Sequence, residues 1–395
     1  MNYPKNLDSA LKWDYKFWST QPVPKFKDIN YVDGQIINID PSTIRQTPYE
    51  LVEGFEWCSL NVNEDDVVNN NNSVTISEFL DKYYIENSSN EFRLHYPADF
   101  IKWMYGHKLS LCIGVRHMQT KSLMGLICGK VSNMQINKNK MDMIEINLLC
   151  IHPKLRQKRL TPVLIKEITR QFNLKGYYQG VYTDANYLPK PIITANYYHR
   201  AINIETLLAT GFTQLDSTND LENVKRVLHL PDKNSKTFKK MESHHLDSVY
   251  ELFNKYISKY NYHPIYTKEE FAYIFMDNKF VTSYVFENEY GDVKDFASYY
   301  TLPTKVLKNE KYKFINKAYL FYYTSNETTP YKIINELLIV AKNNNIDVFD
   351  ALNIMENESI LKELKFEEGT GMLHYYFYNW QSKPLKNVQV GVVFM

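Results

Sequence analysis

The chain has 395 residues, a length that predicts two units of roughly 150–200 residues or one unusually large domain. Hydrophobic residues make up 44% and charged residues 23%, so the composition excludes a disordered tail, a collagen and a coiled coil. A formal net charge of +1 at pH 7 excludes a strongly basic protein that wraps nucleic acid.

Signals for targeting and for metal binding are weak in this sequence. No apolar run approaches the ~18 residues of a membrane span, and the first residues do not resemble a signal peptide. The four cysteines lack Cys-x-x-Cys spacing, which predicts neither a zinc site nor a disulfide framework. We therefore expect a cytoplasmic protein with no metal and no nucleic-acid partner.

The first half of the chain begins with an irregular segment over residues 1–50. Its spaced prolines disfavour helix and sheet, while Trp13, Phe17 and Trp18 are too apolar for a free tail, so we expect it to pack on the body. After it, hydrophobic periodicity predicts a helix, two strand pairs and a second helix. These elements are a helix over 74–84, strands over 109–115 paired with 123–131 and 134–136 paired with 141–151, and a helix with Thr161 as N-cap and Pro162 as first residue.

The second half repeats this order of elements after a polar stretch over 213–240, which we interpret as a linker. The expected elements are helices over 246–256 and 333–343 and strands over 280–286, 295–301, 318–323, 375–380 and 388–395. An α/β fold (mixed α+β) follows from this alternation. No close sequence repeat is visible, so a duplicated fold rests on the element order alone.

Aromatic residues are the one clear excess, at 15% with 32 tyrosines. A compositional bias is one explanation, since asparagine, lysine and isoleucine are also plentiful. The other is that some tyrosines line an amphipathic groove, where an apolar ring and a polar tip are both useful. Composition alone cannot choose which tyrosines do so.

The most informative segment is residues 145–162. A hydrophobic strand ends at Ile151, a loop with four cations follows, and a helix opens near Thr161. The first N–H groups of a helix lack internal partners, so this turn can bind phosphate. It has neither the Walker pattern nor GxGxxG. A solvated basic loop that caps a helix is the alternative.

The motif Arg156-x-x-Arg159-x-Thr161 resembles the coenzyme A pyrophosphate loop of GNAT-superfamily acyltransferases. More narrowly, EINLLCIH at 145–152 followed by LRQKRLTPVLIKEITR at 155–170 is similar to the signature of the N-myristoyltransferase family. Further segments fit the family in order. They are 15–18, 20–24, 181–183, 188–191, 197–200, 300–303 and 375–380. The chain is identified as a member of this family.

The resemblance implies two pseudo-symmetric GNAT-like halves that form a saddle-shaped mixed sheet flanked by helices. Residues 1–50 would contact acyl-CoA, 51–215 would bind myristoyl-CoA, and 216–395 would bind the peptide. The implied reaction transfers a tetradecanoyl group from its CoA thioester to the N-terminal glycine of a protein. We expect a monomer whose partners are Gly-initiated protein N-termini, with myristoyl-CoA as co-substrate.

The family resemblance also assigns roles to single residues. Backbone N–H groups of Leu148 and Leu149 would stabilise the oxyanion, Asn147 and Thr183 would hold the amine, and the carboxylate of Met395 would be the general base. The acyl-CoA contacts would be Tyr15, Lys16, Phe17, Trp18, Leu148, Leu149, Cys150, Ile151, Arg156, Gln157, Lys158, Arg159, Leu160, Thr161 and Pro162. The peptide groove would include Tyr84, Tyr96, Ala185, Tyr197, His199 and Phe212.

Each of these roles has a purely structural alternative. Leu148, Leu149 and Cys150 suit a strand core, a single Tyr is more often half-buried core, and Thr183 and Asn147 suit polar capping at a strand end. The run to Met395 could be a terminal strand that completes the sheet. We interpret His152 as a structural histidine rather than as a base.

Four departures from the family pattern mark a divergent member. The acidic run after Tyr84 is reduced to Glu86 followed by Asn and Ser, the Gly of a Tyr-Thr-Ala-Gly turn is replaced at Ala185, and Pro153 replaces a cation. The late glycine-rich signature reads KFEEGTG over 365–371, with Glu367 and Thr370 where Gly and Asp are expected. Two other functions therefore stay open: a weakened relative that binds acyl-CoA or acylated peptides, and a GNAT-type acyltransferase for another acyl chain. Loss of the acidic run should also weaken any preference for a downstream Lys.

Overall fold

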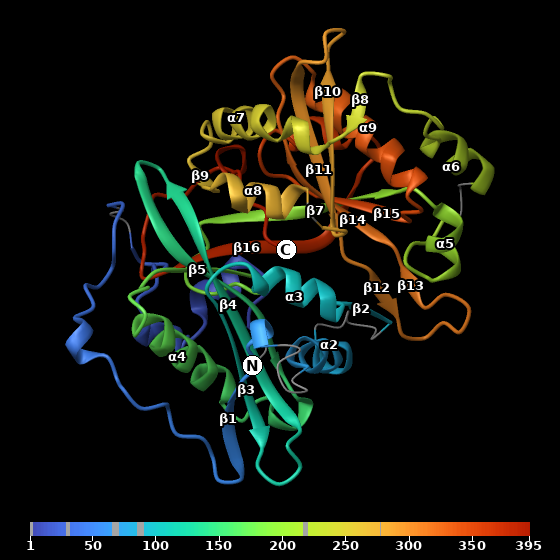
Figure 1. Cartoon of the computed structure of the whole chain (residues 1–395). Helices are drawn as coiled ribbons and strands as arrows, with labels where there is room; N and C mark the ends of the chain where they lie inside the picture. The colour runs from blue at the N-terminus through green and yellow to red at the C-terminus, as the bar shows by residue number, and fades with distance from the viewer. Residues whose placement is uncertain (1–2, 29–31, 65–70, 85–90, 216–219, 277) are drawn as a thin grey trace.

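The computed structural model describes residues 3–28, 32–64, 71–84, 91–215, 220–276 and 278–395. A large mixed sheet runs through the molecule, with helices on both faces (Figure 1). This confirms the expected mixed α/β fold. None of the helices in these ranges is long and apolar enough to cross a bilayer.

The helices alternate with strands along most of the chain. They are α1 Leu7–Lys12, α2 Asn72–Tyr83, α3 Ala98–Gly106, α4 Leu160–Asn173, α5 Ile204–Ala209, α6 Leu221–Leu228, α7 Leu246–Ile257, α8 Lys268–Phe275, α9 Pro330–Asn343 and α10 Glu358–Leu361. The strands of the first half are β1 Phe55–Ser59, β2 Phe92–Leu94, β3 Ser110–His117, β4 Leu123–Ile136, β5 Asn139–Ile151, β6 Gly180–Asp184 and β7 Ile193–Ala201. Those of the second half are β8 Phe238–Lys240, β9 Tyr262–Pro264, β10 Val281–Glu287, β11 Val293–Thr301, β12 Thr304–Val306, β13 Phe314–Ile315, β14 Lys317–Tyr323, β15 Val348–Leu352 and β16 Glu367–Tyr378.

Within the described residues, the main sheet has the strand order β1-β3-β4-β5-β6-β16-β7-β15-β14-β11-β10-β8, and β9 pairs with β4. The late strand β16 thus lies between β6 and β7, so the two halves of the sequence share one continuous sheet. A smaller sheet of β13, β12 and β2 lies beside it. The division into units at residues 50 and 215 stays a prediction.

Two apolar cores flank the first half of the sheet. On one face, α4 packs Leu164, Ile168 and Phe172 onto β3, β4 and β5. On the other face, α2 and α3 bury residues such as Phe79 and Phe100 in the main core. The predicted second helix of this half is confirmed as α4, and the three residues named here form its almost fully buried face.

Five predicted elements are wrong in detail. The N-terminal segment, which was expected to be irregular, contains helix α1 before its first closely spaced prolines. Strand β4 is continuous over Leu123–Ile136, because Ser132 and Asn133 still pair with β5. The expected linker over 213–240 contains α6 and β8. Helix α4 begins at Leu160 with Arg159 as N-cap, so neither Thr161 nor Pro162 has its predicted position. The segment after residue 388 is not a strand, since it makes a 3-10 turn at Asn387–Gln389 and then runs irregularly through the core.

The close approach of α4 to β4 gives a test of this packing. A Cβ added at Gly129 would lie 2.9 Å from both Ile146 and Phe172 side chains. We therefore expect Gly129→Ala to lower the free energy of unfolding by ~1–3 kcal/mol, the usual cost of overpacking. Gly34→Ala is the control, because nothing lies within 4 Å of its added Cβ. Equal denaturant midpoints for the two variants would contradict this packing.

Candidate active site

Strand β5 is interrupted by a bulge at the position predicted to stabilise an oxyanion. Cys128 pairs with Asn147 and Leu126 pairs with Cys150, so Leu148 and Leu149 together oppose the single residue Ile127. Leu148 has a left-handed backbone with φ 52° and is 2% exposed, whereas Leu149 is 36% exposed. A bulge leaves the extra residue outside the regular ladder and redirects its backbone groups. The left-handed conformation of a leucine costs roughly 1–2 kcal/mol, so the surrounding packing has to enforce it.

The bulge also reverses which residues of β5 face each core. Before it, Ile144 and Ile146 pack on the α4 side while Met143 faces the main core. After it, Leu148 and Cys150 face the main core and Ile151 packs on the α4 side. The strand can therefore bury both of its ends only with the extra residue in place.

Strands β5 and β6 separate next to the bulge. Their parallel pairing covers only Ile144 to Ile146 with Gly180 to Tyr182. Asn147 and Thr183 are the next residue on each strand, so the two predicted amine-holding residues lie together where the strands part. Along its other edge, β6 pairs with β16 from Gly180 to Asp184, and there Thr183 is opposite Tyr375.

The side chain of Asn147 is oriented by a buried carboxylate. Its Nδ2 donates to Glu145 Oε1 at 2.8 Å, and Ser132 Oγ donates to Glu145 Oε2 at 3.1 Å. Lys130 Nζ lies 3.5 Å from Glu145, which is only 6% exposed. Because its amide nitrogen is already engaged, Asn147 presents its amide oxygen as the group that can accept a hydrogen bond from an amine.

The basic loop after β5 is held by its own arginine. Arg156 donates from Nη2 to the Tyr83 carbonyl at 2.7 Å and from Nε to the Ile151 carbonyl at 3.1 Å. Its guanidinium thus ties the loop to the end of α2. The half-exposed His152 accepts from the Lys154 N–H and packs edge-on against Tyr83, in agreement with a structural role. Partial burial, with Lys154 and Arg156 nearby, lowers the pKa of His152.

The N-terminus of α4 has no side-chain cap. Gln157 and Arg159 both have left-handed backbones, with φ 66° and 61°, and they turn the chain into the helix at Leu160. The first turn contains no acidic residue, and Lys158 and Arg159 are exposed. Within the part of the chain that the structure describes, neither cation has an ion-pair partner. The first helical N–H groups and two cations are therefore available to an anion.

The N-terminal segment packs beside the separated strands. Trp18 stacks on Tyr182 with ring centroids 5.3 Å apart, and Tyr182 stacks on Tyr376 at 5.0 Å. Tyr15 is buried and donates its hydroxyl to the Tyr187 carbonyl at 3.0 Å, and burial raises its pKa to about 12. Between these anchors, Lys16 is exposed and Phe17 is half-buried. Of the four acyl-CoA contacts predicted in this segment, Lys16 and Phe17 have the more exposed side chains, and all four stay predictions.

The C-terminal segment, residues 390–395, passes through the centre of the molecule. Its backbone bonds to tyrosines: Tyr375 donates its hydroxyl to the Val392 carbonyl at 3.1 Å, Val393 donates its N–H to the Tyr322 hydroxyl at 3.1 Å, and Tyr300 donates to the Phe394 carbonyl at 3.4 Å. The apolar run predicted a strand. After one bridge to β9, where Gly391 donates its N–H to the Tyr262 carbonyl at 2.7 Å, tyrosine hydroxyls bond to this backbone in place of a ladder.

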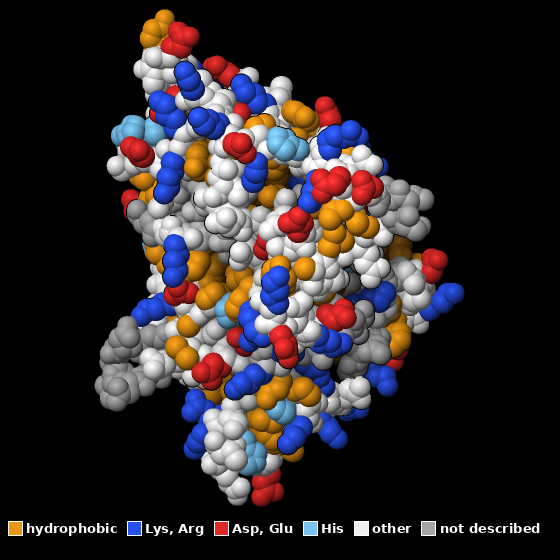
Figure 2. All heavy atoms as spheres, turned by 90° about the vertical axis from the view of Figure 1, so that its right-hand side faces the viewer, with side chains coloured by type: hydrophobic (Ala, Val, Ile, Leu, Met, Phe, Trp, Pro, Cys, Tyr) orange, Lys and Arg blue, Asp and Glu red, His pale blue; other side chains and the backbone are white. Residues whose placement is uncertain are grey.

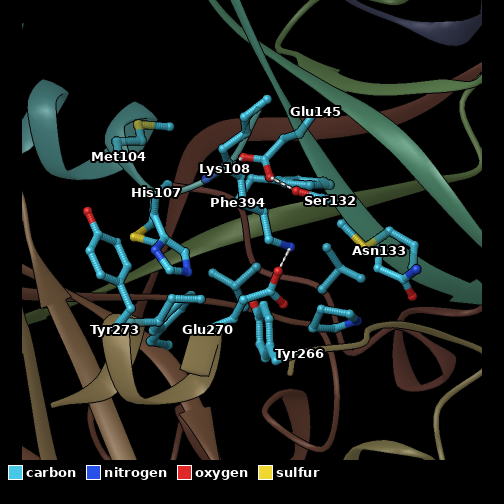
Figure 3. Close-up of a pocket in the computed structure, with 18 of the residues that line it drawn as sticks. Met104, His107, Lys108, Ser132, Asn133, Glu145, Tyr266, Glu270, Tyr273 and Phe394 are labelled. Atoms are coloured by element: carbon cyan, nitrogen blue, oxygen red, sulfur yellow. Dashed lines mark hydrogen bonds and ion pairs between the residues drawn. The ribbon is translucent and has the colours of Figure 1, made fainter. Parts of the chain in front are cut away.

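Met395 lies in a pocket shared by both halves of the chain. Strand residues Ser132 and Glu145 enter from the first half, and Tyr266, Glu270 and Tyr273 enter from the second, with Phe394 among them (Figure 3). Lys108 and Glu270 form an ion pair of 2.6 Å in the pocket wall. The half-buried Met395 thus lies in the same pocket as Glu145, the residue that orients Asn147.

The predicted peptide residues form two neighbouring groups and one separate position. Tyr84 packs edge-on against the buried Tyr96 at 5.7 Å, and His199 packs edge-on against Phe212 at 6.3 Å. Tyr197, whose pKa is raised by burial and by nearby Asp350 and Tyr96, lies between them.

On the face of the molecule shown in Figure 2, Lys and Arg are mixed with Asp and Glu, and hydrophobic side chains show between them. Ile85 to Ser89, with the reduced acidic run, lies outside the described residues, so the effect on Lys preference stays a prediction.

Ala185 stands apart, exposed in the turn after β6. Asp184 accepts hydrogen bonds from the backbone and side-chain nitrogens of Asn186, both at 2.7 Å, and burial raises the Asp184 pKa. The carboxylate thus closes the turn, and Ala185 has no left-handed backbone. The loss of glycine at this position needs no conformational compensation.

Sequence reasoning missed several residues of the site. Glu145, Tyr322 and the buried pair of Lys317 and Asp350 were assigned no role, although the tyrosine excess was a signal for the hydroxyls that hold the C-terminal segment.

Elsewhere in the described residues, His244, His245 and Glu287 lie together, and their side chains are of the types that bind metal ions. His245 Nδ1 accepts the Glu242 N–H and Nε2 lies 2.6 Å from Glu287, so both ring nitrogens are already used. This cluster is a hydrogen-bonded contact that uses the groups a metal would need.

A mixed sheet with two parallel strands that separate beside a bulge and an uncapped helix N-terminus is the architecture of GNAT-like acyltransferases. Comparisons with known proteins narrow this class. The N-terminal domain of the Myristoyl-CoA:protein N-myristoyltransferase family matches residues 36–195, and the C-terminal domain matches residues 209–393. The chain belongs to this family.

Individual relatives agree over nearly the whole chain. The chain is 38% identical to glycylpeptide N-tetradecanoyltransferase of Plasmodium falciparum over 99% of this chain and 96% of that protein. Identity to glycylpeptide N-tetradecanoyltransferase 2 of Bos taurus is 37%, over 98% of this chain and 78% of that protein. The Saccharomyces cerevisiae N-myristoyltransferase structure with bound myristoyl-CoA has a TM-score of 0.89 at 32% identity, covering 97% and 99% of the two chains.

The exposed cations at the α4 N-terminus give the second prediction. Lys158→Ala combined with Arg159→Ala should weaken binding of acyl-CoA by roughly one to three orders of magnitude, because charge-assisted hydrogen bonds to phosphate are strong. Titration of each protein with a CoA thioester at several salt concentrations measures this, and the salt dependence should flatten in the variant. Lys154→Ala is the control. Unchanged affinity in the double variant would mean that the loop is only a solvated surface.

Proposed function

We propose that this protein transfers a tetradecanoyl group from its CoA thioester to the N-terminal glycine amine of proteins. The observation that supports this most directly is the convergence of three features: the β5 bulge, the parting of β5 from β6 at Asn147 and Thr183, and the buried segment that ends at Met395. Membership of the N-myristoyltransferase family supports the choice of acyl group and acceptor.

In this proposal the co-substrate is held by the first half of the chain. Lys158, Arg159 and the free N–H groups at the start of α4 bind the CoA phosphates, and the loop tied down by Arg156 keeps them in place. Lys16 and Phe17 cover the ligand from the N-terminal segment. The acyl chain enters where β5 and β6 part, beside Leu148 and Cys150.

The chemical step is a direct attack of the glycine nitrogen on the thioester carbonyl. Negative charge develops on the carbonyl oxygen, and backbone N–H groups at Leu148 and Leu149 stabilise it. Asn147 and Thr183 hold the amine by hydrogen bonds, and the carboxylate of Met395 takes its proton. A C–N bond forms, the C–S bond breaks, and CoA leaves as a thiolate that then takes up a proton.

The peptide lies along Tyr84, Tyr96, Tyr197, His199 and Phe212 in this proposal. We further propose that the protein acts as a cytoplasmic monomer, with residues 51–215 serving the acyl-CoA and 216–395 serving the peptide. Steady-state assays with myristoyl-CoA and Gly-initiated peptides test the function. Acyl-CoA binding without turnover would favour a binding relative, and turnover only with another acyl chain would favour a different acyltransferase.

The base assignment gives the third prediction. Deleting Met395, or adding one Gly after it, moves the carboxylate by one residue, so turnover should fall at least a hundredfold because the reacting groups are misplaced. Acyl-CoA affinity should stay within about twofold, since that site belongs to the first half. Met395→Leu keeps the carboxylate in place and should be nearly silent. Full activity in the deletion and extension variants would remove Met395 from the mechanism.

A further inference from the structure

A buried charge pair lies behind His199, one of the residues of the proposed peptide groove. Asp350 of β15 is opposite His199 in register, and its Oδ1 lies 2.7 Å from His199 Nδ1. Its other oxygen lies 2.6 Å from Lys317 Nζ, at the start of β14. Exposure of the side chains falls from 31% for His199 to 9% for Lys317 and 2% for Asp350.

Lys317 is packed so that its ammonium stays at Asp350. Nζ lies 5.4 Å from the ring centroid of Phe212 and 5.2 Å from that of Tyr319, which are favourable distances for a cation above an aromatic face. Burial alone would raise the pKa of Asp350, but Lys317 and the hydrogen bond with His199 outweigh it and lower the pKa. Asp350 is therefore a carboxylate, and Lys317 balances its charge.

The ion pair of Lys317 and Asp350 determines which nitrogen of His199 can accept a hydrogen bond from a ligand. With the carboxylate already neutralised, Nδ1 carries the imidazole proton and donates it to Asp350, so Nε2 keeps a lone pair. Nδ1 faces the buried Asp350, and Nε2 lies on the other edge of this partly exposed ring, next to Gly369. A Cβ added at Gly369 would lie 2.3 Å from Nε2, so only a glycine backbone fits there. This close approach explains why Gly369 is present in an otherwise altered signature.

Other charged groups near His199 are few. Glu367 of β16 is opposite it in register and is exposed, and Glu368 accepts a hydrogen bond from Asn196. Arg200, the next residue along β7, turns away and donates to the Leu364 carbonyl. Asp350 and Lys317 are thus the buried charges that act directly on the ring.

We propose that Lys317 is a positioning residue that, through Asp350, holds His199 neutral with its proton on Nδ1, so that Nε2 accepts a hydrogen bond from a donor group of the bound peptide. This inference rests on the proposed function, because it takes His199 as part of the peptide groove. It adds that the ring presents a hydrogen-bond acceptor, rather than a positive charge, to the peptide.

The test is Lys317→Met, which keeps the aliphatic stem and removes the charge. Asp350 is then left with His199 as its charge partner, which favours the imidazolium, and a protonated Nε2 can no longer accept. We expect the peptide KM of this variant to rise about three- to tenfold between pH 8.5 and pH 6, the effect of losing one hydrogen bond, while the KM of the unaltered protein stays within twofold. A Lys-containing peptide should be affected more than its Ala counterpart.

Three controls separate this effect from general damage. Lys317→Arg restores the charge and should restore the flat profile. Lys305→Met removes a lysine from a similar but more exposed triad, in which Lys305 lies 3.4 Å from Asp81 and Asp81 lies 2.6 Å from His95, and it should leave the profile flat. Adding His199→Gln to Lys317→Met should abolish the pH dependence, since Gln does not titrate. A flat profile in Lys317→Met alone would overturn the proposal.

A second measurement does not depend on activity. Nitrogen chemical shifts of ¹⁵N-labelled histidines, assigned with His199→Gln, report the tautomer directly in the unaltered protein. We expect protonated Nδ1 and bare Nε2 at pH 7, and an imidazolium or a protonated Nε2 would overturn the inference even if Lys317→Met failed to fold. If no peptide is acylated at any pH, the proposed function is wrong. The nitrogen shifts still test the tautomer of His199, because that measurement does not require activity.

Discussion

The structure depends on a stretch of backbone that crosses the core and, among the described residues, touches a strand only through one bridge between Val390 and Tyr262 of β9. Buried N–H and C=O groups need hydrogen bonds, and leaving one unpaired costs about 1–3 kcal/mol. For Gly391 this requirement is met by the carbonyl of Tyr262. From Val392 to Phe394 it is met by the hydroxyls of Tyr300, Tyr322 and Tyr375. Each of these tyrosines is itself nearly fully buried. Its ring packs in the apolar core while its hydroxyl oxygen bonds to the segment.

These hydrogen bonds connect the C-terminal segment, which carries the proposed base, to the strands that carry the proposed amine-holding residues. Tyr375 is on β16, which inserts between β6 and β7 and is paired with Thr183. The same tyrosine therefore bonds to the C-terminal segment and lies opposite the strand that separates from β5. The β5 bulge, Asn147 and Met395 can keep a fixed arrangement because all are attached to one continuous sheet rather than to two movable domains.

Sequence patterns predicted the parts of this arrangement that follow regular periodicity. Helix α4, which buries Leu164, Ile168 and Phe172, and most strands were predictable because each has at least one buried face. The bulge at Leu148 could not be read from periodicity, since apolar residues fill both faces of β5 and hide the change of parity. The C-terminal segment was mistaken for a strand for a related reason: its side chains are apolar, whereas its hydrogen bonds go to tyrosines distant in sequence. The cap of α4 was misplaced because a left-handed Arg159, unusual for a non-glycine residue, starts the helix early.

The central claim is that tyrosine hydroxyls position the C-terminal carboxylate proposed as the base. The most direct measurement is kcat together with acyl-CoA affinity for Tyr322→Phe combined with Tyr375→Phe, which removes both hydroxyls and little volume. Tyr323→Phe is the matched control, because its hydroxyl is also buried but bonds to Asn357. The account predicts that kcat of the double variant falls about ten- to a hundredfold, as expected for a small displacement of a reacting group, with acyl-CoA affinity unchanged. A kcat equal to that of the Tyr323→Phe control would contradict it.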